Sequence, residues 1–277
     1  MAGFADQQDA ISRIENLWAH LEYEAETPES PLIGVNFADT DVSDAGLVHL
    51  EGLSTVQNID LHGTHITDEG LRSLRGLTQL TTLYLNETPL TDAALEHLQE
   101  LTGLQSLYLN RTRITGTGLA HLAGCRQLHT LDLWGTPLSA AGLEQVARLT
   151  GLHWLNLIGT PVDDDGLRHV RDLRQLQTLY LVGTEVTDKG LQNLSELYEL
   201  QKLGLNFLPI TDAGLAPLRK LENMRWLNLI GTQIGDAGLK HLRGMENLQK
   251  LSLTGTNVTP KGLRKLQKWL PRLVLEA

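Results

Sequence analysis

Leucine and other aliphatic residues return along this chain every 24 residues, in one pattern that recurs ten times between residues 29 and 268. The ten segments begin at residues 29, 53, 77, 101, 125, 149, 173, 197, 221 and 245, and they align without an insertion. Their shared template is LxxLxxLxLxxTxITDxGLxxLxx, whose positions we number 1 to 24. A fixed period of this length is typical of a solenoid, in which each repeat packs only on its neighbours.

Each repeat predicts a short strand followed by a short helix. The alternating leucines around positions 6–10 predict a strand with two leucines facing inward. Thr or Ser at position 15 predicts a helix N-cap, and Asp at position 16 lies in the first turn, where the helix dipole favours a negative charge. The GLxxL run then places two leucines on one helical face. Gly at position 18, replaced by Ala94 in one repeat, predicts a close approach of helix and strand.

The segments outside the repeats predict caps for the two ends of the solenoid. Residues 6–22 have helical spacing of apolar side chains and predict an amphipathic N-terminal helix. Its apolar positions are Ala10, Ile11, Ile14, Leu17, Trp18 and Leu21. The run KWLPRLVLEA predicts a truncated further repeat, with Trp269 covering the last leucines. We therefore expect a single structural domain with an N-terminal helical cap at 1–28, ten repeats at 29–268 and a C-terminal cap at 269–277.

The template resembles the leucine-rich repeat, in the 24-residue bacterial form similar to GALA-type and ribonuclease-inhibitor-like repeats, over about 240 of the 277 residues. The resemblance implies an α/β solenoid curved as a horseshoe, with a parallel β-sheet on the concave face and short helices on the convex face. It also implies protein recognition. This chain departs from the family at position 12, where Thr replaces the usual Asn. The eighth repeat has Leu208 there, and we expect its turn to be distorted.

Side chains at positions 6, 8 and 10 should point away from the core, toward the concave face. Three of the five Trp and three of the five Tyr fall at these positions, where no core requirement places them. The sequence WLNLIGT occurs at 154–160 and at 226–232, three periods apart, so its two copies occupy the same strand slot. We expect the anchors of a binding surface to be Tyr84, Tyr108, Trp134, Trp154, Tyr180 and Trp226. We expect specificity from Asp60, Asp132, Asn156 and Asn228.

One group of these residues also predicts a pocket on the concave face. Gly204 lacks a side chain at position 8 of the irregular eighth repeat, between Tyr180 and Trp226. With Phe207 and Asn228 nearby, the missing side chain predicts a hollow among aromatic rings. A protein or peptide partner bound on this face, without catalysis, is the function that the sequence favours.

Charge adds an alternative function. The net charge is −15 in residues 1–100, −2 in residues 101–200 and +7 in residues 201–277. Such a gradient favours a structural module that self-assembles as a weak homo-oligomer through its acidic N-terminal and basic C-terminal ends. The total of −10 argues against broad nucleic-acid binding, and the lack of an 18-residue apolar run argues against a membrane span. One cysteine and no signal-peptide pattern lead us to expect a cytoplasmic protein.

Motifs of catalysis are missing: the sequence contains no GxxxxGK[ST], GxSxG, HExxH or CxxC. We therefore predict no enzyme, no catalytic residue, no metal and no cofactor. His62 and His65 have a metal-like spacing, but a strand-end His and a turn His should diverge. Acids at 163–165 are expected to cap a helix, and Cys125 at position 1 is expected to be buried and inert. His49, His97, His121, His169 and His241 all stand at position 21, which indicates a helix-surface preference.

Overall fold

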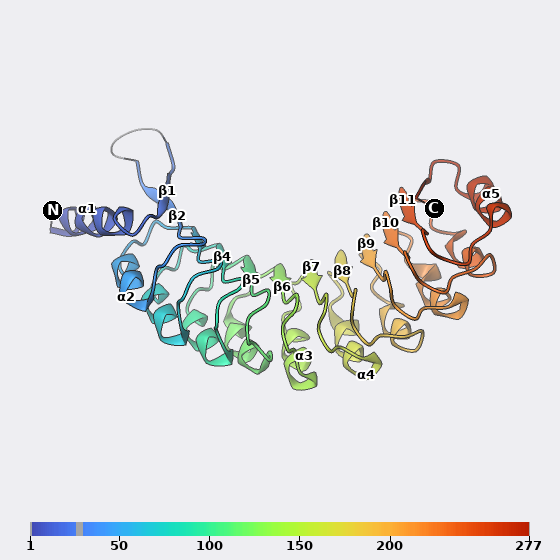
Figure 1. Cartoon of the computed structure of the whole chain (residues 1–277), viewed down its shortest axis with the longest axis horizontal. Helices are drawn as coiled ribbons and strands as arrows, with labels where there is room; N and C mark the ends of the chain where they lie inside the picture. The colour runs from blue at the N-terminus through green and yellow to red at the C-terminus, as the bar shows by residue number, and fades with distance from the viewer. Residues whose placement is uncertain (1, 26–29, 277) are drawn as a thin grey trace. The chain divides into compact units, whose positions relative to one another are not determined.

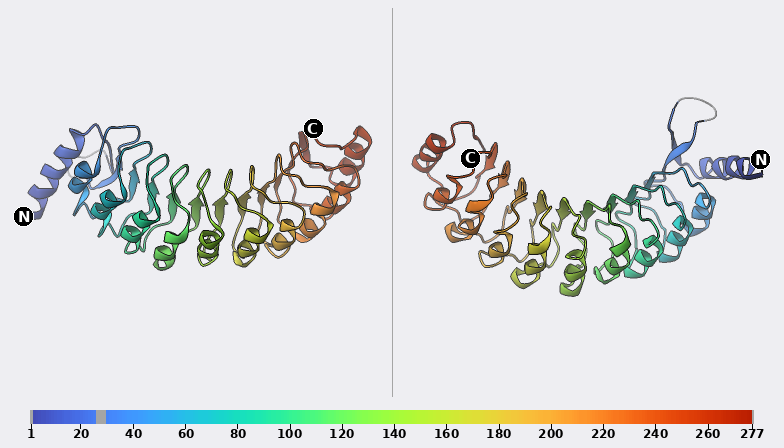
Figure 2. Two further views of the ribbon diagram at one scale, coloured as in Figure 1. Left: turned by 60° about the horizontal axis from the view of Figure 1, so that its bottom comes forward. Right: turned by 180° about the vertical axis from the view of Figure 1, so that it is seen from behind.

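A computed structural model describes residues 2–25 and 30–276, which form two compact units, an N-terminal unit of residues 1–132 and a C-terminal unit of residues 133–277. In each unit the strands lie along one side and the short helices along the other (Figure 1). The two further views keep this separation (Figure 2). The predicted boundary at residues 28 and 29 lies outside the described residues. Each unit is thus a stretch of solenoid with a strand face, formed by side chains at positions 6, 8 and 10, and a helix face.

The N-terminal unit begins with a helix and a strand that precede the repeats, and then alternates strands with helical turns. Its α-helices are α1 (Ala2–Glu15) and α2 (Asp44–Leu47), and its 3₁₀ turns are η1 (Val48–Leu50), η2 (Asp68–Leu74), η3 (Asp92–Leu98) and η4 (Thr117–Gly124). Its strands are β1 (His20–Tyr23), β2 (Leu32–Asn36), β3 (Asn58–Asp60), β4 (Thr82–Tyr84), β5 (Ser106–Tyr108) and β6 (Thr130–Asp132). From β2 to β6 successive strands are parallel, in a register offset by one repeat.

The C-terminal unit follows the same order. Its α-helices are α3 (Ala140–Val146), α4 (Asp164–Leu167) and α5 (Pro260–Trp269), and its 3₁₀ turns are η5 (Arg168–Asp172), η6 (Gly190–Leu194), η7 (Asp212–Leu215), η8 (Pro217–Lys220) and η9 (Gly238–Leu242). Its strands are β7 (Trp154–Asn156), β8 (Thr178–Tyr180), β9 (Lys202–Gly204), β10 (Trp226–Asn228), β11 (Lys250–Ser252) and β12 (Val274–Glu276). From β7 to β12 each strand pairs in parallel with the next.

Leucines fill the space between the strand face and the helix face. The central strand residue of each repeat, such as Leu83 or Leu155, is fully buried, and so is the second strand leucine two residues later. The helical leucines, such as Leu95 and Leu98, are buried against them. Burying an aliphatic side chain contributes about 1.5–3 kcal/mol, so the stack of repeats, rather than one repeat, is the stable object.

Most of the predicted helices are 3₁₀ turns rather than α-helices. The segment between positions 16 and 22 is only two turns long, and it must bring both leucines of GLxxL to the core. A 3₁₀ turn places residues three apart on the same side, which suits this spacing in a short piece. Only the described segments 140–146 and 260–269 form α-helices of seven residues or more inside the repeats.

The turn after each strand has a constant geometry that the sequence did not reveal. Position 11 has a positive φ in every repeat, with Gly in most repeats and Glu87, Arg111 and Phe207 among the others. The following Thr donates its hydroxyl to the carbonyl three residues earlier, as Thr88 does to Leu85 (2.6 Å). Leu208 has no hydroxyl, yet its N–H still bonds the Leu205 carbonyl (3.2 Å), and its side chain is buried. The turn therefore keeps this bond and its positive φ, but the N–H of Ile210 bonds the Leu208 carbonyl (2.8 Å), a local difference in line with the expected distortion.

A ladder of carboxylates joins successive repeats. Asp92 accepts hydrogen bonds from the N–H and hydroxyl of Thr115 (2.9 and 2.6 Å) and from the N–H groups of Gly116 and Gly118 (2.9 and 2.8 Å). Asp164 binds Thr187 in the same way. Equivalent backbone N–H groups donate to the other position-16 carboxylates: Thr67 to Asp44, Thr91 to Asp68, Thr211 to Asp188, Gly235 to Asp212 and Thr259 to Asp236. The carboxylate of the position-16 Asp therefore links its repeat to position 15 of the next repeat, and we call this contact the staple.

Of the nine repeats that are followed by another repeat, two lack this carboxylate, and the residue that would receive it changes accordingly. Position 16 is Gly116 in the fourth repeat and Ala140 in the fifth. The next position-15 residues are Ser139 and Asp163, whose side-chain oxygens accept a bond from an N–H three residues later in their own helix (3.0 and 2.7 Å). Where the staple is missing, the helix start is thus held by its own side chain.

The position-18 glycines lie close to a different part of the molecule from the one predicted, which was the strand of the same repeat. A Cβ atom added at Gly190 or Gly214 would meet the carboxylate of the preceding repeat's Asp, and one added at Gly118 would meet the backbone carbonyl of Asp92. The close neighbour is the staple of the preceding repeat, rather than the strand of the same repeat. Glycine leaves room for this contact between repeats, although Ala94 takes the same position in a repeat whose Thr91 still bonds Asp68.

The N-terminal cap differs from the prediction. The helix α1 ends at Glu15, and Ile14 is its fully buried residue among those described. Trp18 is 88% exposed with a positive φ, so its predicted place in the apolar face of the cap is wrong. Instead, β1 (His20–Tyr23) pairs antiparallel with β2 and covers the edge of the sheet, which would otherwise offer unpaired backbone groups.

Candidate functional site

The strand face of the C-terminal unit carries an aromatic cluster of Trp154, Tyr180 and Trp226. The rings of Trp154 and Tyr180 meet edge-to-face, with centroids 5.9 Å apart, and those of Tyr180 and Trp226 do so at 6.1 Å. All three side chains are half-buried. Edge-to-face pairs at these distances are favourable, so each ring holds its neighbour in place. Burial raises the pKa of the Tyr180 phenol, which therefore stays neutral near pH 7.

Gly204 makes this cluster possible, although in another way than the sequence suggested. Tyr180 lies on β8 and Trp226 on β10, with Gly204 on β9 between them. A Cβ atom at Gly204 would stand only 2.9 Å from Cδ1 of Tyr180. The ring of Tyr180 therefore occupies the space that a side chain would have taken. The predicted hollow above Gly204 is wrong, because the glycine admits a ring instead of leaving a cavity.

Phe207 and Trp134, both expected at this surface, rest on glycines of the following repeat. A Cβ atom at Gly231 would lie 2.6 Å from Cδ1 of Phe207, and one at Gly159 would lie 3.8 Å from Cδ1 of Trp134. Phe207 remains 69% exposed, which is unusual for a ring of its size. It extends the apolar surface at the ends of the strands.

The strand face of the N-terminal unit carries a different aromatic pair. Tyr84 and Tyr108 are register partners on β4 and β5, and their rings stack with centroids 4.5 Å apart and planes 11° apart. Burial, followed by the neighbouring Tyr84 and Asp132, raises the pKa of the Tyr108 phenol. These two rings touch directly across adjacent strands, without an intervening glycine.

The polar residues expected to give specificity mainly serve the scaffold. Asp60, Asn156 and Asn228 each accept a hydrogen bond at Oδ1 from the N–H two residues later, at 3.0 to 3.1 Å. Such turns fix the end of a strand. Asp132 is 6% exposed and Asn156 is 7% exposed, so their burial disagrees with the prediction that they contact a partner.

Asp132 is held by a neighbour on the same face. With its amide nitrogen facing the carboxylate, Asn110 donates to both oxygens of Asp132 (2.9 and 3.2 Å) and to Oδ1 of Asn86 (3.3 Å). The N–H of Asn110 also donates to Asn86 Oδ1 (3.1 Å). This polar network explains why a carboxylate is tolerated at a buried place.

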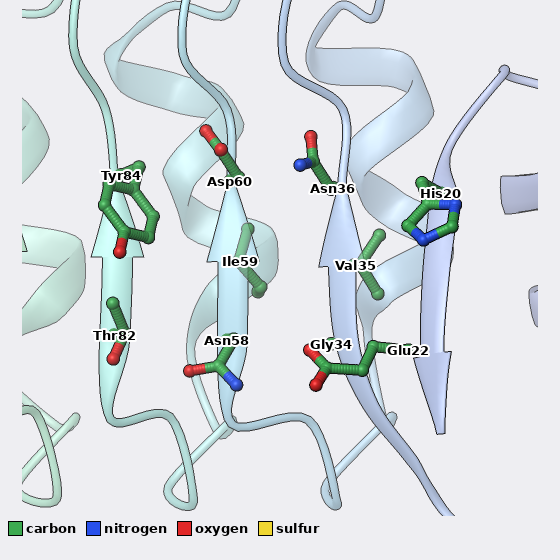
Figure 3. A pocket seen from close by; sticks show the side chains of 10 residues that line it. All are labelled: His20, Glu22, Gly34, Val35, Asn36, Asn58, Ile59, Asp60, Thr82 and Tyr84. Atoms are coloured by element: carbon green, nitrogen blue, oxygen red, sulfur yellow. The ribbon is translucent and has the colours of Figure 1, made fainter. Parts of the chain in front are cut away.

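A pocket of about 510 Å³ lies on the strand face of the N-terminal unit, across β1 to β4 (Figure 3). Its polar side chains come from all four strands, while Gly34, Val35 and Ile59 form the apolar part of its lining. The polar lining consists of His20, Glu22, Asn36, Asn58, Asp60, Thr82 and Tyr84. Sequence reasoning missed this pocket because it assigned residues 20 and 22 to a helix. The alternation of His20, Leu21, Glu22 and Tyr23 was the signal for a strand.

The candidate metal ligands do not converge. Nε2 of His62 lies 3.9 Å from an Asp39 carboxylate oxygen, and these two groups are fewer than the three protein ligands of a typical zinc site. Asp163 caps its own helix, and Asp164 staples the next repeat. Within residues 2–25 and 30–276, no group of three His, Cys, Asp or Glu side chains could hold a metal ion. Burial raises the pKa of the Cys125 thiol to about 11, as expected for an inert cysteine.

One of the position-21 histidines is buried. His97 is 6% exposed, and its Nδ1 lies 2.7 Å from a guanidinium nitrogen of Arg75. Burial, followed by the charge of Arg75, lowers the pKa of His97. Since Arg75 can only donate, His97 accepts the bond as the neutral ring.

Comparisons with known proteins agree with this architecture. A leucine-rich repeat family model matches residues 244–266. A comparison with curated proteins gave no match. Among solved structures, an internalin of Listeria monocytogenes is similar at 20% identity, over 96% of this chain and 93% of that chain, with a TM-score of 0.50. An internalin C2 of the same organism is similar at 25% identity, over 80% and 81%, with a TM-score of 0.53.

A third similar structure is the leucine-rich repeat ectodomain of the membrane receptor kinase GASSHO1/SCHENGEN3 of Arabidopsis thaliana, in complex with Casparian strip integrity factor 2. It is 18% identical over 91% of this chain and 30% of that chain, with a TM-score of 0.57. At such identities the likeness concerns the fold. In the described part of this chain, no helix has both the length and the apolar character needed to span a membrane.

Proposed function

We propose that this chain, a leucine-rich repeat protein by its sequence and its fold, binds a protein or peptide partner through its strand face, with the Trp154–Tyr180–Trp226 cluster as the anchor. Leucine-rich repeat proteins are generally protein-binding scaffolds. The observation that carries the proposal is the edge-to-face contact of three half-exposed rings on the strand face. Aromatic anchors of this kind dominate the energetics of protein interfaces.

Preorganisation supports the choice of this cluster. A free Trp side chain loses rotamer freedom when a partner covers it, which costs about 0.5–1.5 kcal/mol per side chain. Here Tyr180 contacts both Trp154 and Trp226, so part of that cost is met before binding. Exposed Phe207 adds apolar area beside the cluster. Similar structures support the class of ligand: the plant ectodomain is in complex with a named factor.

The proposal is tested by replacing the two tryptophans. Three proteins are immobilised: the wild type, Trp154→Ala/Trp226→Ala and the control Tyr198→Ala. Proteins that each of them captures from a lysate of the source cells are identified by mass spectrometry. Tyr198 is 47% exposed and lies between η6 and β9, outside the cluster, so it controls for loss of an exposed ring. We expect a partner that wild type and Tyr198→Ala retain and that the double variant loses, with binding at least about 100-fold weaker.

Circular dichroism checks that all three proteins are folded. Equal retention by the double variant would move the binding site away from this cluster and contradict the proposal. No specific partner for the folded wild type, together with salt-sensitive oligomers, would favour the alternative function, a self-assembling structural module. The charges motivate that alternative: the N-terminal unit holds 6 Lys and Arg against 19 Asp and Glu, whereas the C-terminal unit holds 17 against 14.

A further inference from the structure

The register of the first strands arranges the pocket of the N-terminal unit in two rows. One row runs through His20, Asn36, Asp60 and Tyr84, which are successive partners on β1, β2, β3 and β4. The other row runs through Glu22, Gly34, Asn58 and Thr82 on the same strands. All but Gly34 present a polar group on the strand face (Figure 3). The pocket is therefore a grid of side chains on a rigid sheet rather than a loop cluster.

Gly34 gives this grid its depth. A Cβ atom there would stand 2.7 Å from Oε2 and 2.9 Å from Cβ of Glu22, so the Glu22 side chain lies across the glycine (Figure 3). Its carboxylate is thereby brought from β1 over β2, toward Asn58 on β3, the register partner of Gly34. Asp60 belongs to the other row, so its carboxylate and that of Glu22 stand diagonally across the pocket, whose volume of about 510 Å³ admits a planar side-chain head group.

The lining determines what this space accepts. Two carboxylates, two amides, a hydroxyl, a phenol and the imidazole of His20 line the pocket, and no Lys or Arg is among the lining residues. The N-terminal unit as a whole has a net charge of −13. An anion would be repelled, and a wholly apolar group would leave the carboxylates without partners. The complementary ligand is a cation with several hydrogen-bond donors.

We propose that this pocket binds the guanidinium group of an arginine side chain in a peptide partner, a proposal that rests on the proposed function of the strand face. Glu22 and Asp60 supply charge, Asn58 and Thr82 supply further acceptors, and the Tyr84 ring borders the pocket as a π surface. Arginine fits better than lysine because its planar fork donates in several directions and stacks on aromatic rings. The Tyr84 ring is itself fixed by stacking on Tyr108.

The test uses small peptides, so that it does not depend on the unknown partner. The folded full-length protein, with ¹³C-labelled tyrosine rings, is titrated with acetyl-Gly-Gly-Arg-Gly-Gly-amide and followed by NMR. The matched peptides carry citrulline, which has nearly the same shape without charge, or lysine. Tyr84→Phe assigns the Tyr84 signal among the five tyrosines. We expect the arginine peptide to shift the signal of Tyr84 more than that of Tyr180, with about tenfold weaker binding of the citrulline peptide.

Variants locate the binding groups. Glu22→Gln/Asp60→Asn keeps the shapes, and the amide oxygen introduced at position 60 would still accept the bond that Asp60 takes from the N–H of His62. We expect this variant to bind the arginine peptide at least about tenfold more weakly. Asp41→Asn/Glu100→Gln removes two exposed carboxylates of the same unit outside the pocket and should bind as wild type does.

Three results would overturn the proposal: equal shifts with the citrulline peptide, equal affinity for the lysine peptide, or wild-type affinity in Glu22→Gln/Asp60→Asn. None of them would affect the test of the proposed function, which measures the Trp154–Tyr180–Trp226 cluster of the C-terminal unit. Conversely, loss of that cluster's role would leave arginine binding by the pocket measurable with the same peptides.

Discussion

The two units present the same strand positions with different chemistry. In the N-terminal unit, Tyr84 and Tyr108 stack on adjacent strands beside an acidic, acceptor-rich pocket. In the C-terminal unit, Tyr180 reaches over Gly204 to meet a tryptophan two strands away. One surface is polar with a single aromatic pair, and the other is an apolar cluster. The leucines and turns beneath both surfaces are the same, so surface chemistry varies independently of the scaffold.

The comparison also shows two ways of holding a ring on a flat sheet. Adjacent strands bring register partners within stacking distance, as for Tyr84 and Tyr108. Rings on strands that are not adjacent meet only if the strand between them carries no side chain, as at Gly204. A glycine at position 8 therefore sets the breadth of the aromatic surface.

The largest effect should come from removing the staple in either unit. Asp92→Ala leaves the donors of Thr115, Gly116 and Gly118 without their acceptor, and Asp164→Ala does the same at Thr187 and Gly190. Hydrogen bonds to a charged group contribute about 1.5–3 kcal/mol, so we expect each variant to lose roughly 3 kcal/mol of unfolding free energy in urea. Similar losses would show that the scaffold is common to both units. A loss in one unit only would break the comparison.

Acid titration sharpens the same comparison. Burial alone would raise the pKa values of Asp92 and Asp164, but hydrogen bonds from Thr115 and Thr187 and from the backbone lower them below 3.8. A carboxylate with a lowered folded pKa contributes its full stability above the unfolded value and loses it as the pH falls through the folded value. The difference between wild type and either alanine variant should therefore shrink below about pH 4. A constant difference between wild type and either alanine variant down to about pH 2 would contradict this assignment.

A smaller effect is expected from Gly204→Val, which breaks the C-terminal surface alone. The added Cβ would lie 2.9 Å from the Tyr180 ring, so the ring must leave its place between Trp154 and Trp226. Loss of two edge-to-face contacts, each worth about 0.5–1.5 kcal/mol, should lower the unfolding free energy by roughly 2 kcal/mol. The near-ultraviolet circular dichroism of the aromatic rings should weaken. Thr82→Val puts the same side chain on the strand face of the N-terminal unit, in nearly the volume of threonine, and should change neither quantity much.

The smallest effect concerns the position-21 histidines of the two units. Burial and then Arg75 lower the pKa of His97, and burial and then Lys240 and Arg219 lower that of His241. With lowered folded pKa values, both sites contribute stability that is complete above the unfolded value of 6.5 and decreases as the pH falls below it. His97→Gln and His241→Gln should each flatten the decline of unfolding free energy between about pH 7 and pH 5. A steeper decline in either variant would contradict this assignment.

The sequence was sufficient to predict the repeat fold, because a 24-residue period is compatible with few folds. It also placed Trp154, Tyr180 and Trp226 on one surface, since alternation along a strand decides which side chains leave the core. It could not show that Tyr180 fills the space at Gly204, because a missing side chain looks alike whether a ring or a cavity takes its place. Whether Trp226 and the other five expected anchors contact a partner stays a prediction.

Two other features were not predicted, and only the first of them has a signal in the sequence. The staple joins residues 23 positions apart. It could have been inferred because Asp at position 16 is followed by Thr at position 15 of the next repeat in every case but Gly235, whereas Ser139 and Asp163 follow Gly116 and Ala140. The exposed Trp18 could not have been found from its helical spacing, which fits a cap equally well. What decides its place is the end of α1 at Glu15 and the strand that follows.

The staple also restricts which duplications and deletions of sequence this solenoid can tolerate. Because each carboxylate meets the same slot of the next copy, removal of residues 197–220 would bring Asp188 to Gly235, whose N–H now bonds Asp212 (2.7 Å). The shortened chain would keep its contact between repeats. A deletion whose length is not a multiple of 24 residues would separate the acid from its donor and turn leucines outward. Such a chain can lengthen or shorten only by whole repeats. Its surface residues can therefore change gradually, whereas its length cannot.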